Sequence, residues 1–68
     1  MFDRNKFRGK VVSEGLTLAT VAEKIGISTA ALYRKMSGES DFTRLELQRL
    51  RAVLNLTDDD LNTIFFAE

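Results

Sequence analysis

Hydrophobic residues recur every three or four positions along most of this chain, which is the spacing that places them on one face of an α-helix. Residues that cap or end helices separate these repeats into five blocks. The blocks cover residues 2–14, 17–25, 28–37 and 43–55, and the fifth begins with Thr57 as its cap. The pattern predicts an all-α fold, and the length of 68 residues allows a single domain, residues 1–68.

The stretch from Thr17 to Gly38 is expected to organise the fold. Its first helix has apolar residues at i, i+3, i+4 and i+7, namely Leu18, Val21, Ala22 and Ile25. Thr17 can cap this helix, and Gly26 stands where a helix ends with a positive φ. Ser28 can cap the second helix, which turns Ala31, Leu32 and Met36 inward. Two short helices joined by a tight turn, with a polar outer face on the second, are typical of the helix-turn-helix of DNA-binding proteins.

The sequence at this point resembles the phage repressor and Cro family, the XRE-type helix-turn-helix proteins. The matching residues are Val21-Ala22, Ile25-Gly26-Ile27-Ser28, Leu32 and Gly38. The end segments FDRNKFRGKVV and DLNTIFFAE are also similar to small prophage regulators of this family. The resemblance implies a compact five-helix, lambda-repressor-like DNA-binding domain with the helix-turn-helix at helices 2 and 3. A plain helical hairpin in a small bundle is the alternative.

The first helix is predicted over residues 2–14, with Asp3 as its cap and Gly15 at its end. Its buried side is expected to comprise Phe7, Val11 and Val12. Gly9 is unusual inside a helix, because glycine costs up to about 1 kcal/mol relative to alanine. It either permits the close approach of a neighbouring helix or breaks the helix.

The fourth helix begins with the clearest local signal in the chain. Thr43 and Glu46 fit a capping box, in which each side chain accepts a hydrogen bond from the other residue's amide. Phe42 and Leu47 can form the accompanying hydrophobic staple. The inner face is expected to comprise Leu47, Leu50, Val53 and Leu54, and the outer face Arg44, Gln48, Arg49 and Arg51.

The last helix follows at once, because Asn55 is expected to end the fourth helix in a left-handed conformation and Leu56 to pack over the junction. Its first turn holds three carboxylates, Asp58, Asp59 and Asp60, which favour the positive end of the helix dipole. Consecutive helical residues diverge by about 100°, so no metal site is expected there. The inward residues are Leu61, Ile64 and Phe65. Phe66 is left either exposed or buried in a dimer contact.

The formal net charge is zero, but the charges are separated along the chain. Residues 1–51 hold all ten Lys and Arg and six carboxylates, whereas residues 52–68 hold only four carboxylates. The first part therefore has a charge of +4 and the second of −4. Such a separation orients a protein on a polyanion even without net charge.

The second helix of the motif is the expected reader of the major groove. Its base-reading residues are predicted to be Thr29, Ala30, Tyr33 and Arg34, where the Ala30 methyl can contact thymine. Arg34 either pairs with guanine or reaches only a phosphate, depending on the tilt of the helix. Contacts to the DNA backbone are expected from Thr17, Thr20, Ser28, Lys35 and Arg44. The resemblance places the next loop against the same backbone, which adds Ser37, Ser40 and the Gly38 amide. Many relatives carry glutamine where this chain has Leu18, so Thr17 and Thr20 are given more weight.

Other classes of function find less support in the sequence. Without histidine, cysteine or a Gly-rich phosphate loop, an enzyme is not expected, and neither is a cofactor, a metal or a small-molecule ligand. No run is long enough for a membrane span and no signal peptide is visible, so the bacterial cytoplasm, in association with the nucleoid, is the expected location. The expected partners are double-stranded operator DNA and a second copy in a homodimer. The alternatives are an antitoxin that binds its toxin through the acidic, aromatic C-terminal end, and a protein-interaction module such as an anti-repressor.

Overall fold

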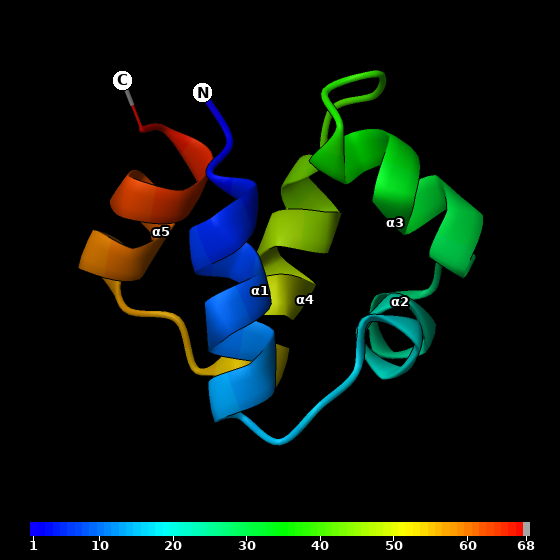
Figure 1. Cartoon of the computed structure of the whole chain (residues 1–68), viewed down its shortest axis with the longest axis horizontal. Helices are drawn as coiled ribbons and strands as arrows, with labels where there is room; N and C mark the ends of the chain where they lie inside the picture. Colours follow the sequence, from blue (N-terminus) through cyan, green and yellow to red (C-terminus); the bar gives the residue numbers. More distant parts are fainter. Residues whose placement is uncertain (68) are drawn as a thin grey trace.

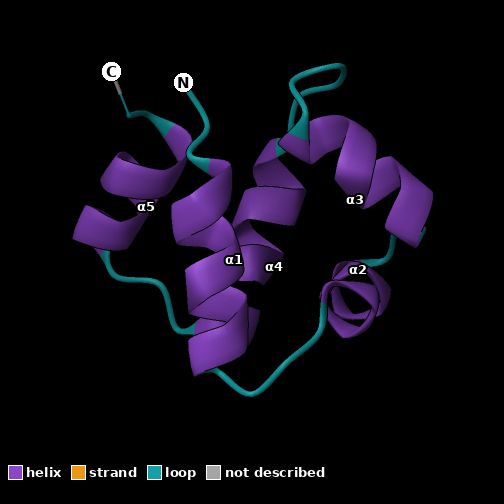
Figure 2. Ribbon diagram, in the orientation of Figure 1, coloured by secondary structure: helices purple, strands orange, loops and turns teal. Residues whose placement is uncertain are grey.

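Five α-helices account for most of residues 1–67, which are the residues that the computed structural model describes, and no strand occurs among them. The helices are α1 (Arg4–Ser13), α2 (Leu18–Ile25), α3 (Thr29–Met36), α4 (Arg44–Leu54) and α5 (Asp58–Phe65). Figures 1 and 2 show α1 beside α5, with α2 and α3 together at the other side of the molecule. The predicted all-α class is confirmed. None of the described helices has the length and apolar character needed to cross a membrane.

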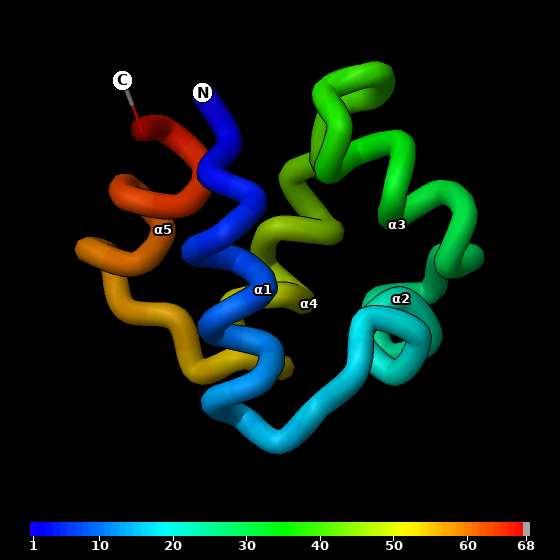
Figure 3. The backbone as a smooth tube through the Cα atoms, viewed as in Figure 1, coloured from blue at the N-terminus to red at the C-terminus, as the bar shows by residue number. Residues whose placement is uncertain are grey.

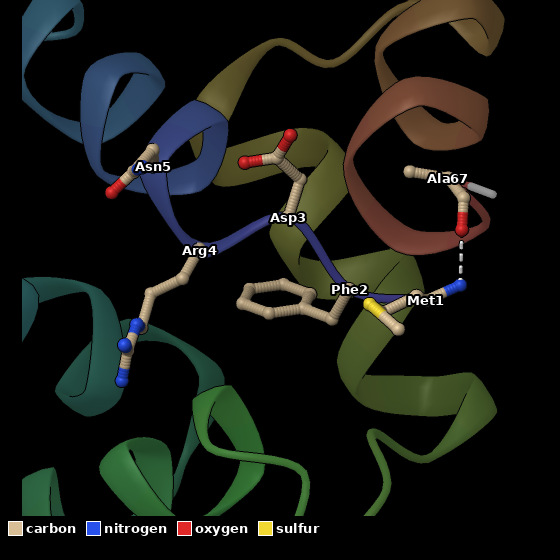
Figure 4. A pocket seen from close by; sticks show the side chains of 6 residues that line it. All are labelled: Met1, Phe2, Asp3, Arg4, Asn5 and Ala67. Carbon is tan, nitrogen blue, oxygen red and sulfur yellow. Dashed lines mark hydrogen bonds between the residues drawn. The ribbon is translucent and has the colours of Figure 1, made fainter.

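The two ends of the chain meet at the same end of the molecule, as the tube in Figure 3 shows. The Asp3 amide donates a hydrogen bond of 2.6 Å to the Ile64 carbonyl, and the Met1 ammonium donates to the Ala67 carbonyl. In the close view of Figure 4 the Met1 nitrogen points at the Ala67 oxygen, whereas the Arg4 side chain points away from it. These contacts fasten the start of α1 to the end of α5.

Every helix begins after the residue that the sequence predicts as its cap. The capping side chains, which each accept a hydrogen bond from the amide three residues later, are those of Asp3, Thr17, Ser28, Thr43 and Thr57. The capping box of Thr43 and Glu46 is confirmed, and α5 has a second box between Thr57 and Asp60 that the sequence reading missed. Asn55 ends α4 in the predicted left-handed conformation, with φ of 53°.

The core is drawn from all five helices and matches most of the predicted inward faces. The buried hydrophobic side chains are those of Phe7, Val11, Val21, Ala22, Ile25, Leu32, Met36, Leu50, Leu54, Leu56, Ile64 and Phe65. Val12 is a wrong prediction, because 74% of its surface is exposed. Val11 continues the row that Phe7 begins four residues earlier, so its neighbour Val12 points about 100° away from the core.

The first helix differs from its prediction in two further respects. It is shorter, Arg4–Ser13, because Asp3 is its cap and Phe2 lies outside it. Both interpretations of Gly9 are wrong: the helix continues through this residue, and no atom of another element lies within 4 Å of the position a Cβ would take. We find no packing reason for glycine at this position.

Four phenylalanine rings form a cluster that the sequence reading did not predict. They belong to Phe2, Phe7, Phe42 and Phe65, and their ring centroids lie 5.3–6.3 Å apart. Such tilted and edge-on pairs stabilise a core beyond the area they bury. The cluster joins the N-terminal segment, the loop before α4 and the end of α5.

Candidate nucleic-acid interface

The turn between α2 and α3 is built from backbone hydrogen bonds at the end of α2. Gly26 has a left-handed φ of 82°, its amide bonds the Glu23 carbonyl at 3.1 Å, and the Ile27 amide bonds the Ala22 carbonyl at 3.0 Å. This is the Schellman arrangement, which lets the chain leave one helix sharply. Ser28 then caps α3 at once. Figure 1 shows that the two helices point in different directions.

One face of α3 presents the four residues predicted to read bases. Ala30 and Arg34 are exposed, 47% of the Tyr33 surface is exposed, and Thr29 is half-buried. The opposite face buries Leu32 and Met36 in the core, which fixes the direction in which the first group points. The four residues stand at i, i+1, i+4 and i+5 and therefore share one side of the helix. Their use for reading bases stays a prediction.

Two predicted backbone contacts lie together at the start of α2. The hydroxyl oxygens of Thr17 and Thr20 are 3.0 Å apart, and Thr17 Oγ1 also accepts a hydrogen bond from the Thr20 amide at 3.2 Å. At the start of α3, Ser28 Oγ accepts from the Ala31 amide at 3.0 Å. One of the two threonine hydroxyls donates to the other, which leaves one of their protons available for an anion. The exposed helix start itself also favours an anion.

The loop after α3 folds back on the Arg34 carbonyl. That oxygen accepts hydrogen bonds from Ser37 Oγ at 3.0 Å, the Glu39 amide at 3.0 Å and the Ser40 amide at 3.3 Å. The Gly38 amide donates to the Lys35 carbonyl at 3.3 Å. The Ser37 hydroxyl proton and the Gly38 amide, which the sequence reading assigned to phosphate contacts, are therefore already used within the chain.

Lys35 is held in an ion pair with α4, and its predicted phosphate contact stays a prediction. Its Nζ lies 3.0 Å from Glu46 Oε1 and donates a hydrogen bond of 2.9 Å to the Asp41 carbonyl, and only 13% of its side chain is exposed. Burial raises the pKa of the Glu46 carboxyl, but hydrogen bonds from the Thr43 amide and Lys35, with the charge of Lys35, lower the pKa below its ordinary value. The sequence placed Lys35 near the expected DNA face but could not show its carboxylate partner.

Arg49 makes a contact that the sequence reading missed. It was assigned to the outer face of α4, yet its Nη1 donates a hydrogen bond of 3.1 Å to the Ile25 carbonyl at the end of α2. A cation at a helix C-terminus complements the helix dipole, and the guanidinium satisfies one of the carbonyls left free there. Nothing in the sequence distinguished Arg49 from the other polar residues predicted on that face.

The charges of the described residues are distributed unevenly between the elements. Within residues 1–67, the cations in ion pairs are Lys10 with Glu14 and Asp60, Lys35 with Glu46, and Arg51 with Asp58. The other cations have no carboxylate within 4.0 Å in this part of the chain, and they include Lys24 on α2, Arg34 on α3 and Arg44 at the start of α4. Glu23 on α2, and Glu39 and Asp41 in the loop after α3, also form no ion pair in this part of the chain, so the side with α2 and α3 carries unpaired charges of both signs.

The aspartates at the start of α5 have separate partners, because Asp58 pairs with Arg51 at 2.8 Å and Asp60 with Lys10 at 3.7 Å. The hydrogen bond from the Thr57 amide is the main cause that lowers the pKa of Asp60.

Near the chain ends, 62% of the Phe66 surface is exposed, beside a largely apolar groove of about 540 Å³. Met1, Phe42 and Leu47 contribute to its lining. A dimer contact of Phe66 stays a prediction.

Comparison of the chain with protein-family models, with curated proteins and with solved structures finds no match.

Proposed function

We propose that this protein is a sequence-specific, double-stranded DNA-binding transcriptional regulator, in which α2 and α3 act as a helix-turn-helix and α3 enters the major groove. The observation that carries the proposal is the outer face of α3. There Ala30, Tyr33 and Arg34 are exposed on a helix whose other side is locked in the core. A helix with that combination can present side chains to base edges without rearranging.

The roles within the interface follow from the chemistry of each group. Arg34 pairs with guanine O6 and N7, and the Ala30 methyl packs on a thymine methyl. The start of α2, with the Thr17 and Thr20 hydroxyls, binds a phosphate, and Arg44 binds another. A homodimer would read two half-sites about 34–36 Å apart. The proposal places the protein in the bacterial cytoplasm and gives it no catalytic role.

A second candidate is a protein-binding role at the end of the molecule where the chain termini meet. The groove of about 540 Å³ beside Phe66, with 90% of the Met1 surface exposed, is the observation that favours it. An antitoxin would use such a surface for its toxin while α3 binds DNA, and an anti-repressor would use it without binding DNA.

The experiment replaces Tyr33 and Arg34 together with alanine and measures binding to a duplex that the wild-type protein selects. Both residues are outside the core, so circular dichroism should show an unchanged fold. Loss of binding with the fold intact supports direct reading by α3. Unchanged binding rejects it, and a wild-type protein that prefers no duplex favours the anti-repressor class.

A further inference from the structure

Helix α4 contacts the α2 and α3 pair at two points that lie one turn apart. Glu46 Oε1 is 3.0 Å from Lys35 Nζ in the last turn of α3. Three residues further on, Arg49 Nη1 donates its 3.1 Å hydrogen bond to Ile25 at the end of α2. Residues at i and i+3 lie on the same side of a helix. One side of α4 therefore contacts the C-terminal ends of both α2 and α3.

The first of these contacts is largely shielded from solvent, and each of its two side chains has a second partner. The side chains of Lys35 and Glu46 are 13% and 12% exposed. Lys35 also holds the Asp41 carbonyl at 2.9 Å, and the Thr43 amide donates to Glu46 Oε1 at 2.8 Å. The pair thus joins three pieces of chain, namely the end of α3, the following loop and the start of α4. An ammonium held in this way must break two contacts before it can reach a phosphate.

The second contact fixes the turn itself. The two Schellman hydrogen bonds satisfy the Ala22 and Glu23 carbonyls, and Arg49 adds a charge-assisted bond to Ile25, the last residue of α2. Because the turn leads straight into α3, a fixed turn gives α3 a fixed starting direction.

We propose that Glu46 and Arg49 form a two-point clamp that sets the orientation of α3 for base reading, and that Lys35 is a positioning residue of this clamp and not a phosphate contact. This inference rests on the proposed function. A clamp of this kind acts on specificity, because base contacts depend on the direction of α3 more than phosphate contacts do.

The decisive variant is Glu46→Gln. The loss of a negative charge and the loss of the clamp should change its affinity for the selected duplex in opposite directions. The amide oxygen can still accept from the Thr43 amide, but the ion pair with Lys35 is lost. Removing a carboxylate normally strengthens binding to a polyanion. The clamp predicts instead about tenfold weaker binding to a duplex that the wild type selects, whereas binding to an unrelated duplex, which depends on charge, should be equal or stronger. The matched control is Glu39→Gln, whose carboxylate has no ion pair among residues 1–67.

Lys35→Met distinguishes positioning from phosphate contact through the dependence of affinity on salt. Each phosphate neutralised contributes about −0.9 to the slope of log K against log salt. Lys35→Met should bind the selected duplex more weakly with an unchanged slope. Arg44→Met should make the slope less steep by about 0.9, the contribution of one phosphate. Stronger or equal binding of the selected duplex by Glu46→Gln, or a reduced slope for Lys35→Met, overturns the proposal.

A measurement without DNA keeps the clamp testable if the proposed function fails. The amides of Glu39 and Ser40 are bonded to the Arg34 carbonyl beside the clamp, whereas the Leu56 amide is bonded to the Arg51 carbonyl at the other end of α4. In Lys35→Met, hydrogen exchange at Glu39 and Ser40 should be about tenfold faster than in the wild type, with Leu56 unchanged. If the exchange rates of all three amides are the same in Lys35→Met as in the wild type, the clamp is overturned. A wild-type protein that selects no duplex overturns the proposed function alone.

Discussion

The Nη1 atom of Arg49 lies 3.1 Å from the Ile25 carbonyl oxygen and would lie 3.1 Å from a Cβ atom placed on Gly26. The turn between α2 and α3 therefore needs glycine for two reasons. Its φ of 82° is strained for any residue with a side chain, and the guanidinium occupies the space beside it.

Gly26→Ala should destabilise the protein by about 2 kcal/mol, through backbone strain and displacement of Arg49. Gly38→Ala is the matched control, because Gly38 has a similar φ of 87° but open space at its Cβ position. It should cost about 1 kcal/mol from strain alone. Urea unfolding of both variants measures the difference. Equal losses would mean that Arg49 moves aside without cost.

Phe2→Ala should cost about 2 kcal/mol, although Phe2 lies outside the helices. Its ring contacts those of Phe7, Phe42 and Phe65, with centroids 5.3–5.4 Å away, so its removal opens a gap in the core. Phe66→Ala is the control and should change the free energy of unfolding by less than about 0.5 kcal/mol, because most of the ring is exposed. Thermal or urea unfolding at low protein concentration compares them. A larger loss for Phe66 than for Phe2 would contradict this packing.

Stability should fall in acid, with Glu46 as one cause. Its folded pKa lies below the ordinary value of 4.5, so ionised Glu46 stabilises the folded state above that pH. This contribution decreases as the pH falls below about 4.5 and is lost once the pH is below the folded pKa. Urea unfolding between pH 7 and pH 3 should show a shallower decline for Glu46→Gln than for the wild type. Parallel declines would exclude Glu46 as a contributor.

Arg34→Ala should relax the preference for one base pair. A bidentate contact to guanine is worth about 1–3 kcal/mol of discrimination, so the variant should tolerate substitution at a position where the wild type requires guanine. Competition binding with single-base variants of the selected duplex measures this. Arg51→Ala is the control, because Arg51 pairs with Asp58 on α5. A uniform loss of affinity at every position would instead identify Arg34 as a phosphate contact.

The sequence was sufficient for the local features of the fold. Caps such as Thr17 and Thr43, and the left-handed ends at Gly26 and Asn55, depend on residues within a few positions of each other. Helical periodicity likewise placed most of the core. Val12 was misplaced because it follows Phe7 by five residues, whereas the spacing of four puts Val11 on the buried face.

Contacts between distant residues could not be predicted in this way. Phe2 and Phe65 meet only because the fold brings the chain ends together, and the bond of Arg49 to Ile25 joins residues 24 positions apart. Lys35 illustrates the effect on the site. Its type and position suggested a phosphate contact, but its ion pair with Glu46 was not predicted, because Glu46 had been assigned only to a capping box.

The measurement that tests the central claim most directly is selection from a random duplex library at about physiological salt, followed by sequencing of the bound fraction. We predict an enriched motif for the wild-type protein and loss of enrichment when Tyr33 and Arg34 are both alanine. A palindromic motif with half-sites about 34–36 Å apart would also indicate a two-fold dimer. No enriched motif from a protein that circular dichroism shows to be folded would contradict the claim that α3 reads DNA.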